Sequence, residues 1–321
     1  MISRTSMVLI SASLVMVNSA CREDTGAPGD RGVQQPLHFE RLLYAVGAGS
    51  YEALALALAS GAGTVVVSVF DADSFLPDGV EGRVDVQYLV CDGKVSEVVF
   101  DTDDFNLMQA IERWVKQNGR LLKERAAGDV PAGHSYLFAA GAGVPPFKAD
   151  VGPRAEGFAG VFSLSGGVAE SKRAARPTRR VAGIPLYLGA APAGLARHMQ
   201  ADRMRPGSII LGQVPLEDGE GRKVRWQMIS LFCGRDRGFV GSVAAQVVGD
   251  ITEADRLEEN VDRIYEAIAA RGGKHDALKS PGKVLEMVMT MPRTGVRCRV
   301  ELKWWAVPSY GLLAFEAGAM E

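Results

Sequence analysis

The glycine-rich stretch around residue 47 is the part of the sequence closest in pattern to a cofactor site. Residues 42–73 can be interpreted as strand, glycine turn, helix, strand and acid, with Gly47 and Gly49 in the turn. Two such glycines let a backbone approach a nucleotide or S-adenosylmethionine, and Asp71 lies 22 residues beyond Gly49, near the usual ribose-binding spacing. Glu52 stands where the third glycine of G-x-G-x-x-G belongs. Two interpretations follow: a Rossmann-like cofactor unit, or a turn before a buried helix of Ala and Leu, which we favour.

The other residues that could perform catalysis or bind a metal lack the necessary spacing. No serine lies in a G-x-S-x-G elbow, so no catalytic residue is predicted. His134 is expected at a strand end or in a turn. The acidic run at 101–104 lacks the glycine and terminal glutamate of a calcium loop, and instead predicts the start of a helix. The four histidines are scattered and no C-x-x-C pair occurs, so neither a metal site nor a cofactor is expected.

Several elements that must position any site are visible as patterns. Apolar runs at 84–91 and 94–100 flank Asp92-Gly93 and predict a tight hairpin, and 208–216 and 224–232 predict a second one. A helix should follow the first hairpin, capped by Asp103 or Asp104 and ended by Gly119. Further elements are a helix at 251–273, a half-exposed strand at 296–307 and a partner strand at 310–315. The helix at 105–119 takes its apolar stripe from Phe105, Met108, Ile111 and Val115.

The N-terminus has the layout of an export signal. Arg4 precedes an apolar core of eleven residues, and the small residues Ser19 and Ala20 come directly before Cys21. Eleven helical residues span only about 16 Å, so a transmembrane anchor is not expected. The pattern is similar to a bacterial lipoprotein signal, which implies cleavage before Cys21 and attachment of lipid to its thiol; an ordinary secretory leader is the alternative. Arg22 after the cysteine is similar to the class sorted to the outer membrane.

The remaining chain divides into a linker and two predicted domains. Residues 21–36 are rich in Gly, Pro, Gln and charge, which predicts a flexible linker after the signal peptide at 1–20. About 285 residues remain, more than one core usually serves, and we expect two α+β domains at 37–175 and 176–321. Each is expected to have a mainly antiparallel sheet with flanking helices. The three other cysteines, Cys91, Cys233 and Cys298, leave open whether one pair forms a disulfide.

Charge is segregated along the chain although the net charge is only −2. Residues 71–104 contain ten acidic and two basic residues, a net charge of −8, whereas residues 171–205 contain eight basic residues and one acid, a net charge of +7. Such blocks suit steering of an oppositely charged protein, although they can also be solvated faces or dock against each other. The predicted partner-binding residues are Lys172, Arg173, Arg176, Arg179 and Arg180. Export makes nucleic acid an unexpected partner.

Four segments in the order found here resemble one family. They are the leader with its linker, "PAGHSYLF" at 131–138 followed by "GFAGVFSLSGGV" at 157–168, "RRVAGIP" at 179–185, and the helix at 251–271. Their order resembles the immunity lipoproteins that accompany phospholipase effectors of type VI secretion. The resemblance implies a periplasmic protein with two α+β domains that blocks a toxin's active site and has no catalytic residues of its own.

Together these observations predict a protein anchored by lipid at the periplasmic face of the outer membrane. Its expected partner is a secreted lipase-type toxin, which it would inhibit by steric occlusion without enzymatic activity. Two alternatives stay open: a Rossmann-like enzyme that uses the Gly47/Gly49 turn, and an envelope-assembly lipoprotein without a toxin partner.

Overall fold

The computed structural model describes residues 40–70, 84–124, 133–138, 146–154, 157–164, 180–181, 183–217, 223–233, 238–250, 283–307 and 310–320. Its helices are α2 Glu40–Leu43, α3 Ser50–Leu58, α4 Phe105–Asn118 and α5 Pro192–Ala201. Its strands are β1 Thr64–Val69, β2 Asp85–Cys91, β3 Lys94–Thr102, β4 Arg120–Glu124, β5 His134–Phe138, β6 Phe147–Arg154, β7 Gly157–Leu164, β8 Arg180–Val181, β9 Ile184–Pro185, β10 Ser208–Glu217, β11 Lys223–Phe232, β12 Ser242–Asp250, β13 Lys283–Thr290, β14 Arg297–Val307 and β15 Tyr310–Ala319.

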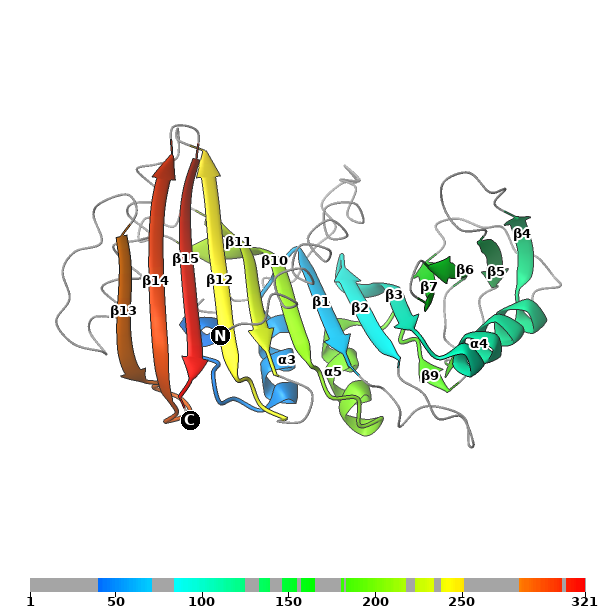
Figure 1. Ribbon diagram of the computed structural model, residues 1–321, viewed down its shortest axis with the longest axis horizontal. Coiled ribbons are helices and arrows are strands. Elements are labelled where there is room, and N and C mark those ends of the chain that lie inside the picture. The colour runs from blue at the N-terminus through cyan, green and yellow to red at the C-terminus, as the bar shows by residue number, and fades with distance from the viewer. Residues whose placement is uncertain are drawn as a thin grey trace.

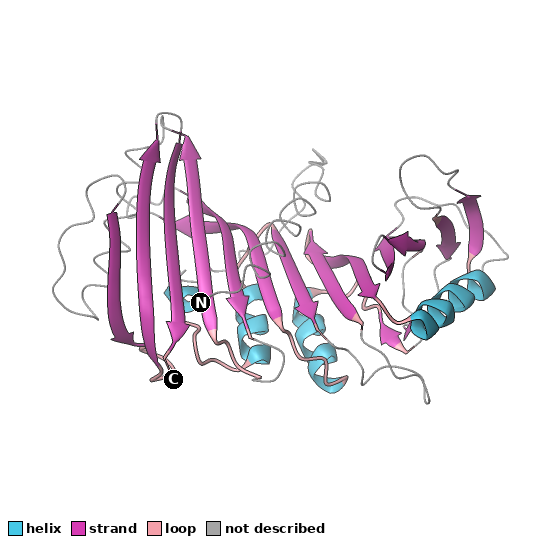
Figure 2. Cartoon of the chain, in the orientation of Figure 1, coloured by secondary structure: helices cyan, strands magenta, loops and turns pink. Residues whose placement is uncertain are grey.

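One large antiparallel sheet organises the described residues (Figure 1). It has 13 strands in the order β13-β14-β15-β12-β11-β10-β1-β2-β3-β7-β6-β5-β4, and β8 pairs separately with β9. Each neighbouring pair in the large sheet is antiparallel. The structure is therefore mostly antiparallel sheet with few helices, as Figure 2 makes plain. The predicted antiparallel sheet with flanking helices is confirmed at this level.

The predicted division into two domains is not visible in the sheet order. β1, from the first predicted domain, lies between β2 and β10, and β10 belongs to the second. Side chains from both segments also form one hydrophobic cluster. The 13-stranded sheet therefore runs without a break through both predicted domains, and the boundary at residue 175 stays a prediction.

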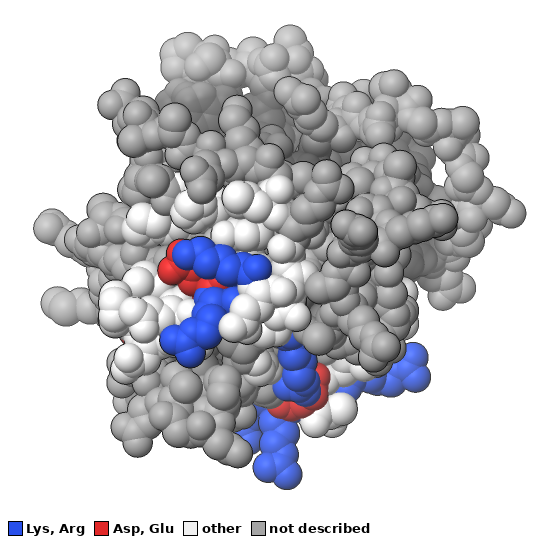
Figure 3. All heavy atoms as spheres, turned by 90° about the vertical axis from the view of Figure 1, so that its right-hand side faces the viewer, with Lys and Arg blue, Asp and Glu red and all other residues white. Residues whose placement is uncertain are grey.

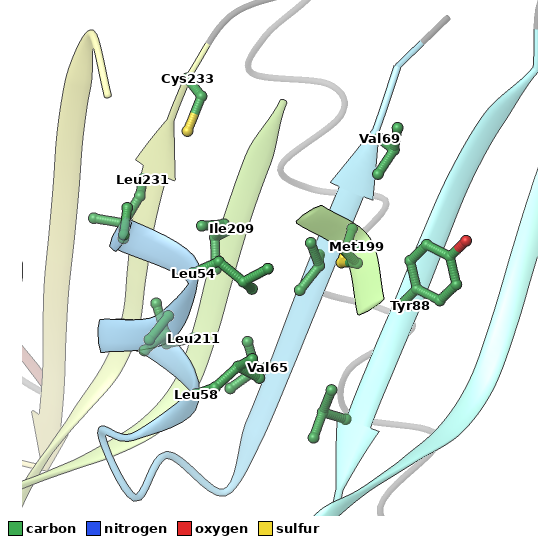
Figure 4. Close-up of a cluster of buried hydrophobic side chains, with 14 of the residues drawn as sticks. Leu54, Leu58, Val65, Val69, Tyr88, Met199, Ile209, Leu211, Leu231 and Cys233 are labelled. Carbon is green, nitrogen blue, oxygen red and sulfur yellow. The ribbon is translucent and has the colours of Figure 1, made fainter. Parts of the chain in front are cut away.

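Helices α3 and α5 pack side by side on one face of the central strands (Figures 1 and 2). Leu54 and Leu58 of α3 point toward β1 and β10, and Met199 of α5 lies near Val69 and Tyr88 (Figure 4). The i and i+4 spacing of the two leucines puts both on one helix face. Burial of each such side chain contributes about 1.5–3 kcal/mol, so this layer holds the two helices in place.

Helix α4 covers the other end of the sheet. Asp104 caps it by accepting a hydrogen bond from the Leu107 N–H at 2.8 Å, and Gly119 ends it, as the sequence predicts. The predicted apolar stripe is partly wrong, because Phe105 is 62% exposed and Leu107 is fully buried in its place. The indole ring of Trp114 stacks on Phe138 with ring centroids 5.5 Å apart, which fixes α4 over β5.

Both predicted hairpins are confirmed. β2 and β3 pair around the turn at Asp92, whose φ is 50°, and β10 pairs with β11 over nine residue pairs. The predicted strand at 296–307 and its partner are β14 and β15, which pair in antiparallel register. In β14, Cys298, Val300 and Leu302 are buried, as expected for a strand with one exposed face.

The glycine turn has a structural role. Residues 40–43 form a short helix rather than the strand of a Rossmann unit, and both neighbours of β1 are antiparallel to it. The Gly47 N–H donates to Val240 O at 2.7 Å and the Ser50 N–H donates to Gly238 O at 2.9 Å, so these donors bind another part of the chain. Helix α3 begins after Gly49 and buries Leu54 and Leu58, which confirms the turn before a buried helix.

Several predictions lie outside the described residues. They are the signal peptide and Cys21, the linker at 21–36, Asp71, the basic residues Lys172, Arg173, Arg176 and Arg179, and the helix at 251–273. Within the described ranges, no helix has the length and apolar character needed to cross a membrane.

Candidate functional site

An open hollow lies between the C-terminal end of α5 and Arg180, which is the first described residue of the basic block 171–205. Its volume is about 470 Å³. Its polar lining comes from Arg180, Tyr187, His198 and Asp202, and its apolar lining includes Pro185, Leu186 and Leu188. We call this the Tyr187 hollow.

Helix α5 positions one wall of the hollow. Pro192 stands at the first turn, where its fixed φ suits a helix start, and Leu195 and Met199 are buried against the sheet. The helix ends at Asp202, whose N–H donates to His198 O at 2.9 Å. The exposed side of the last turn therefore presents the His198 imidazole and the Asp202 carboxylate to the hollow.

The turn at 183–190 positions the opposite wall. Gly189 donates its N–H to Val95 O and the Val95 N–H donates to Ala190 O, both at 2.9 Å, which ties the turn to the start of β3. The Tyr88 hydroxyl, from the neighbouring strand β2, also donates to Pro185 O at 2.7 Å. Because both ends of the turn are bonded to the sheet, Tyr187 is held at a fixed point of the rim.

A polar network joins the two walls. The Arg180 guanidinium donates to Asp202 Oδ1 at 2.5 Å and to Gly183 O at 3.0 Å. The Tyr187 hydroxyl donates to Asp202 Oδ2 at 2.5 Å, and its ring stacks on His198 with centroids 5.9 Å apart. Asp202 thus accepts from a cation and a hydroxyl at once, and charge-assisted bonds of this kind are stronger than neutral ones.

The surroundings of the hollow keep two tyrosine hydroxyls in their neutral form. Burial raises the pKa of Tyr187 first, and the hydrogen bond to Asp202 and its negative charge raise this pKa further. Burial likewise raises the pKa of Tyr88 well above its usual value. Both hydroxyls therefore stay neutral at physiological pH, and Tyr187 serves as a hydrogen-bond donor.

Two backbone conformations at this site are unusual for the residues that adopt them. Tyr187 has φ 50° and Arg203, directly after the Asp202 cap, has φ 58°. A non-glycine residue in this left-handed region costs roughly 1–2 kcal/mol of steric strain. At the C-terminus of a helix, the left-handed position is usually taken by Gly or Asn. The φ of Arg203 belongs to the end of α5, where the Arg203 N–H donates to Gln200 O and the Met204 N–H donates to Met199 O.

Arg180 is the one predicted partner-binding residue within the described ranges. It lies at the hollow's rim with its side chain 46% exposed, but it is paired with Asp202 of the same chain. Its first role is therefore to hold the end of the basic block against α5. Because Asp202 itself lies within the block 171–205, this ion pair does not decide whether the basic block docks against the acidic block 71–104.

The other predicted site residues are dispersed. His134 lies at the start of β5, as predicted for a strand end, and its Nδ1 is buried without a partner. Cys91, Cys233 and Cys298 are buried and form no disulfide with one another, and burial raises the pKa of Cys233 to about 12 and that of Cys298 to about 11. In the parts of the chain that the structure describes, no His, Cys, Asp or Glu cluster could hold a metal ion.

Sequence reasoning missed Tyr187, His198 and Asp202 as members of one site. The available signal was that Asp202 is the single acid within 171–205, a block with eight basic residues. A lone carboxylate in such a block is expected to pair with one of its cations. Its further contact with Tyr187, 15 residues away, depends on the turn geometry.

The surface view shows how the described charges are arranged. Figure 3 shows Lys and Arg at several separate places on the right-hand side of the molecule, with Asp or Glu beside some of them. Described ion pairs include Glu112–Lys116 on α4 at 2.7 Å and Arg180–Asp202. On this face, the described charges include acid–base pairs and do not form one continuous basic patch.

Comparison with protein-family models, curated proteins and solved structures finds no match for this chain. The fold is mainly an antiparallel sheet with few helices, and the hollow lies beside α5.

Proposed function

We propose that this chain is a lipid-anchored binding protein of the bacterial cell envelope, most specifically an inhibitor that covers the active site of a secreted lipase-type toxin. The anchor is Cys21 and the compartment is the periplasmic face of the outer membrane. The apolar leader that stops at Ser19-Ala20-Cys21 supports the compartment, and the polar segment 22–36 suits a tether. Two acyl chains or more give stable membrane attachment, which keeps an inhibitor where a membrane-degrading enzyme acts.

The observation that carries the binding role is the Tyr187 hollow at the end of the basic block. Tyr and Arg are enriched among the residues that contribute most to protein interfaces, and such residues gather around pockets. Here Tyr187 and Arg180 line a rigid hollow with His198, and their bonds to Asp202 fix them before any partner arrives. A preformed site loses less conformational freedom on binding, which favours affinity.

The mechanism is steric. A preformed interface of about 800 Å² on each side is large enough for a specific complex and for blocking a substrate cleft. The surplus of positive charge in 171–205 would speed encounter with an acidic partner, because long-range attraction raises association rates. The chain itself then needs no chemistry beyond binding.

A liposome assay tests the proposal. Purified protein from residue 22 onward would be mixed in turn with secreted lipase-type effectors, starting with any whose gene lies beside its own, and fatty-acid release from phospholipid vesicles would be measured. Loss of hydrolysis at a stoichiometric ratio is expected. Glutamates in place of Lys172, Arg173, Arg176 and Arg179 should slow association about tenfold, whereas Arg297→Glu, at an exposed position of β14, should not. Full hydrolysis at excess protein would contradict the inhibitor role and favour the envelope-assembly alternative.

A further inference from the structure

We propose that one edge of the large sheet docks on a phospholipid surface, with two apolar side chains inserted among the headgroups and two arginines bound to lipid phosphates. The four residues are Arg205, Phe239, Arg297 and Met320, and we call this surface the Phe239 edge. The inference rests on the proposed function for the lipid tether alone, and its test uses protein that lacks the anchor.

Backbone contacts between the ends of distant strands assemble the first half of the Phe239 edge. The Met320 N–H donates to Arg297 O and the Ala319 N–H donates to Gly241 O, both at 2.9 Å. Phe239 comes two residues before Gly241, in the turn that leads into β12. In Figure 1 this turn, the C-terminus and the lower end of α3 lie along the same edge of the sheet. Met320, Arg297 and Phe239 are therefore brought together although they come from three segments.

Helix α3 connects this half of the edge to Arg205. Phe239 forms an isolated antiparallel bridge with Gly49, which directly precedes α3. In the first turn of that helix, Tyr51 accepts a hydrogen bond from the Arg205 guanidinium. A guanidinium has five N–H donors, so this bond leaves Arg205 able to bind a phosphate as well.

The apolar residues of the edge are exposed. Among the described residues, five large apolar side chains are exposed, and two of them lie on the Phe239 edge, Phe239 at 37% and Met320 at 43%. Single exposed apolar side chains are common on proteins in water, so the argument depends on the cations beside this pair. Transfer of both side chains from water into the headgroup region removes apolar surface from water and favours docking.

The charges of the edge suit lipid phosphates. Arg205 and Arg297 are both exposed. Glu52, the acid next to Tyr51 in α3, is bonded by Arg293 and so does not oppose an anion as a free carboxylate would. Arginine binds phosphate through paired hydrogen bonds, and apolar side chains with arginines beside them are a usual composition for docking on a membrane surface.

The tether gives an independent reason to assign lipid to this edge. A flexible chain of the length of residues 22–36 has a root-mean-square span of about 20 Å. The fold begins shortly afterwards with α2, which packs against α3 and β12. Because α3 and the turn before β12 both contribute to the Phe239 edge, a lipid on Cys21 would be held close to it. At the high effective concentration that a short tether provides, even weak docking orients the protein on the membrane.

Vesicle cosedimentation tests the inference. Protein from residue 22 onward would be mixed with vesicles of phosphatidylcholine that contain about 30% phosphatidylglycerol, and we expect half of it to bind at about 1 mM lipid. Phe239→Ser with Met320→Ser should weaken binding about tenfold. Arg205→Gln with Arg297→Gln should weaken it about fivefold or more, and less at high salt. Thermal melts verify that each variant is folded.

Matched controls lie on α4, at the other end of the sheet. Phe105→Ser and Arg113→Gln, both at exposed positions, should leave vesicle binding unchanged. An environment-sensitive fluorescent label on Met320→Cys should emit at shorter wavelength when vesicles are added, whereas the same label on Phe105→Cys should not. The native thiols of the described chain are buried, so the label reacts at the introduced cysteine.

Three results would overturn the inference: no vesicle binding by the anchor-free protein, unaltered binding by the Phe239→Ser and Met320→Ser double variant, or no shift of the label at position 320. Loss of binding only when Lys172 and Arg173 are changed to Gln would assign the lipid contact to the basic block and would also overturn it. Vesicle binding by a protein that inhibits no lipase would contradict the proposed function alone. Inhibition without vesicle binding would contradict this inference alone.

Discussion

The same face of one sheet is apolar and buried at its centre but charged and exposed at its C-terminal end. A single register row runs across both regions, from Val66 through Ile210, Ser230 and Ala244 to three glutamates. The glutamates are Glu316, Glu301 and Glu286. Val66 and Ile210 are each 7% exposed, whereas the glutamate side chains are 33–46% exposed. A strand's position within a sheet therefore decides whether one or both of its faces must be apolar.

The two regions also differ in what opposes strand separation. At the centre, Val66, Leu89, Cys91, Ile210 and Met228 form a compact apolar cluster on this face. At the end, Lys303 contacts Glu301 at 2.9 Å and Glu316 at 3.2 Å, and Arg299 pairs with Glu286. Like charges directly opposite one another destabilise a sheet, so these cations are needed to offset the glutamate row. The centre depends on burial and the end on charge pairing.

The sharpest test of this difference places one charge in each region. Val66→Asp should destabilise the protein by several kcal/mol or prevent folding, because a carboxylate would be buried without a partner. Val288→Asp, on the same face of β13 and 43% exposed, should change the free energy of unfolding by less than about 0.5 kcal/mol. Urea unfolding of both variants measures the contrast. Similar losses in the two would show that the face is equally buried in both regions.

The second prediction concerns the contact between the turn at Gly47 and the segment at Thr294 and Val296. Gly47 has φ 85°, and a Cβ there would lie 2.4 Å from Val296 Cγ2. Gly47→Ala should therefore cost about 2 kcal/mol or more in unfolding free energy, through backbone strain and the clash. Gly93→Ala is the matched control, because it has a positive φ of 70° but no atom within 4 Å of the added Cβ. An equal loss in both variants would assign the effect to φ alone.

The third prediction concerns the carboxyl of Glu97, which lies in the same register row beside Leu89. Burial raises the pKa of Glu97 first, and the negative charge of Asp150 raises it further. A carboxyl whose folded pKa is raised disfavours the folded state above its usual pKa, and this penalty disappears as the pH falls. Glu97→Gln should raise the melting temperature at pH 7 and give little gain near pH 4. A gain that does not depend on pH would contradict the charge argument.

The smallest predicted effect is at Lys303. Lys303→Met should lower stability by about 0.5–1 kcal/mol at low salt and by less at high salt, because the exposed glutamates lose their shared cation. The hydrogen bond from Lys303 lowers the pKa of Glu301, so this contribution exists above the usual carboxyl pKa and is lost as the pH falls through the folded value. The double variant Lys303→Met with Glu316→Gln should recover part of the loss. No salt or pH dependence in melts of these variants would exclude the pairing argument.

Local patterns in the sequence determined much of the secondary structure. Asp92-Gly93 predicted its hairpin because the dipeptide takes positive φ angles readily, and Asp104 predicted a helix start because its carboxylate can accept a backbone N–H. The alternation of Arg297, Cys298, Arg299 and Val300 predicted one exposed face for β14. Each of these features depends on neighbours within a few residues, which is why the sequence alone could determine them.

The tertiary structure decided which distant segments meet. No local pattern states that β10 pairs with β1, that the Gly47 N–H bonds to Val240, or that Tyr187 shares Asp202 with Arg180. These contacts depend on the order of the strands in the whole sheet. The turn at 183–190 is positioned by its hydrogen bonds to β3, and α5 is positioned by its packing on the same sheet. The same reason explains why Leu107 of α4 is buried and Phe105 is exposed. The packing of α4 against β5 determines which face of the helix points inward, and Phe105 is not on that face. Sequence periodicity determines that an element has an apolar face, but only the packing partner determines which residues of that face are buried.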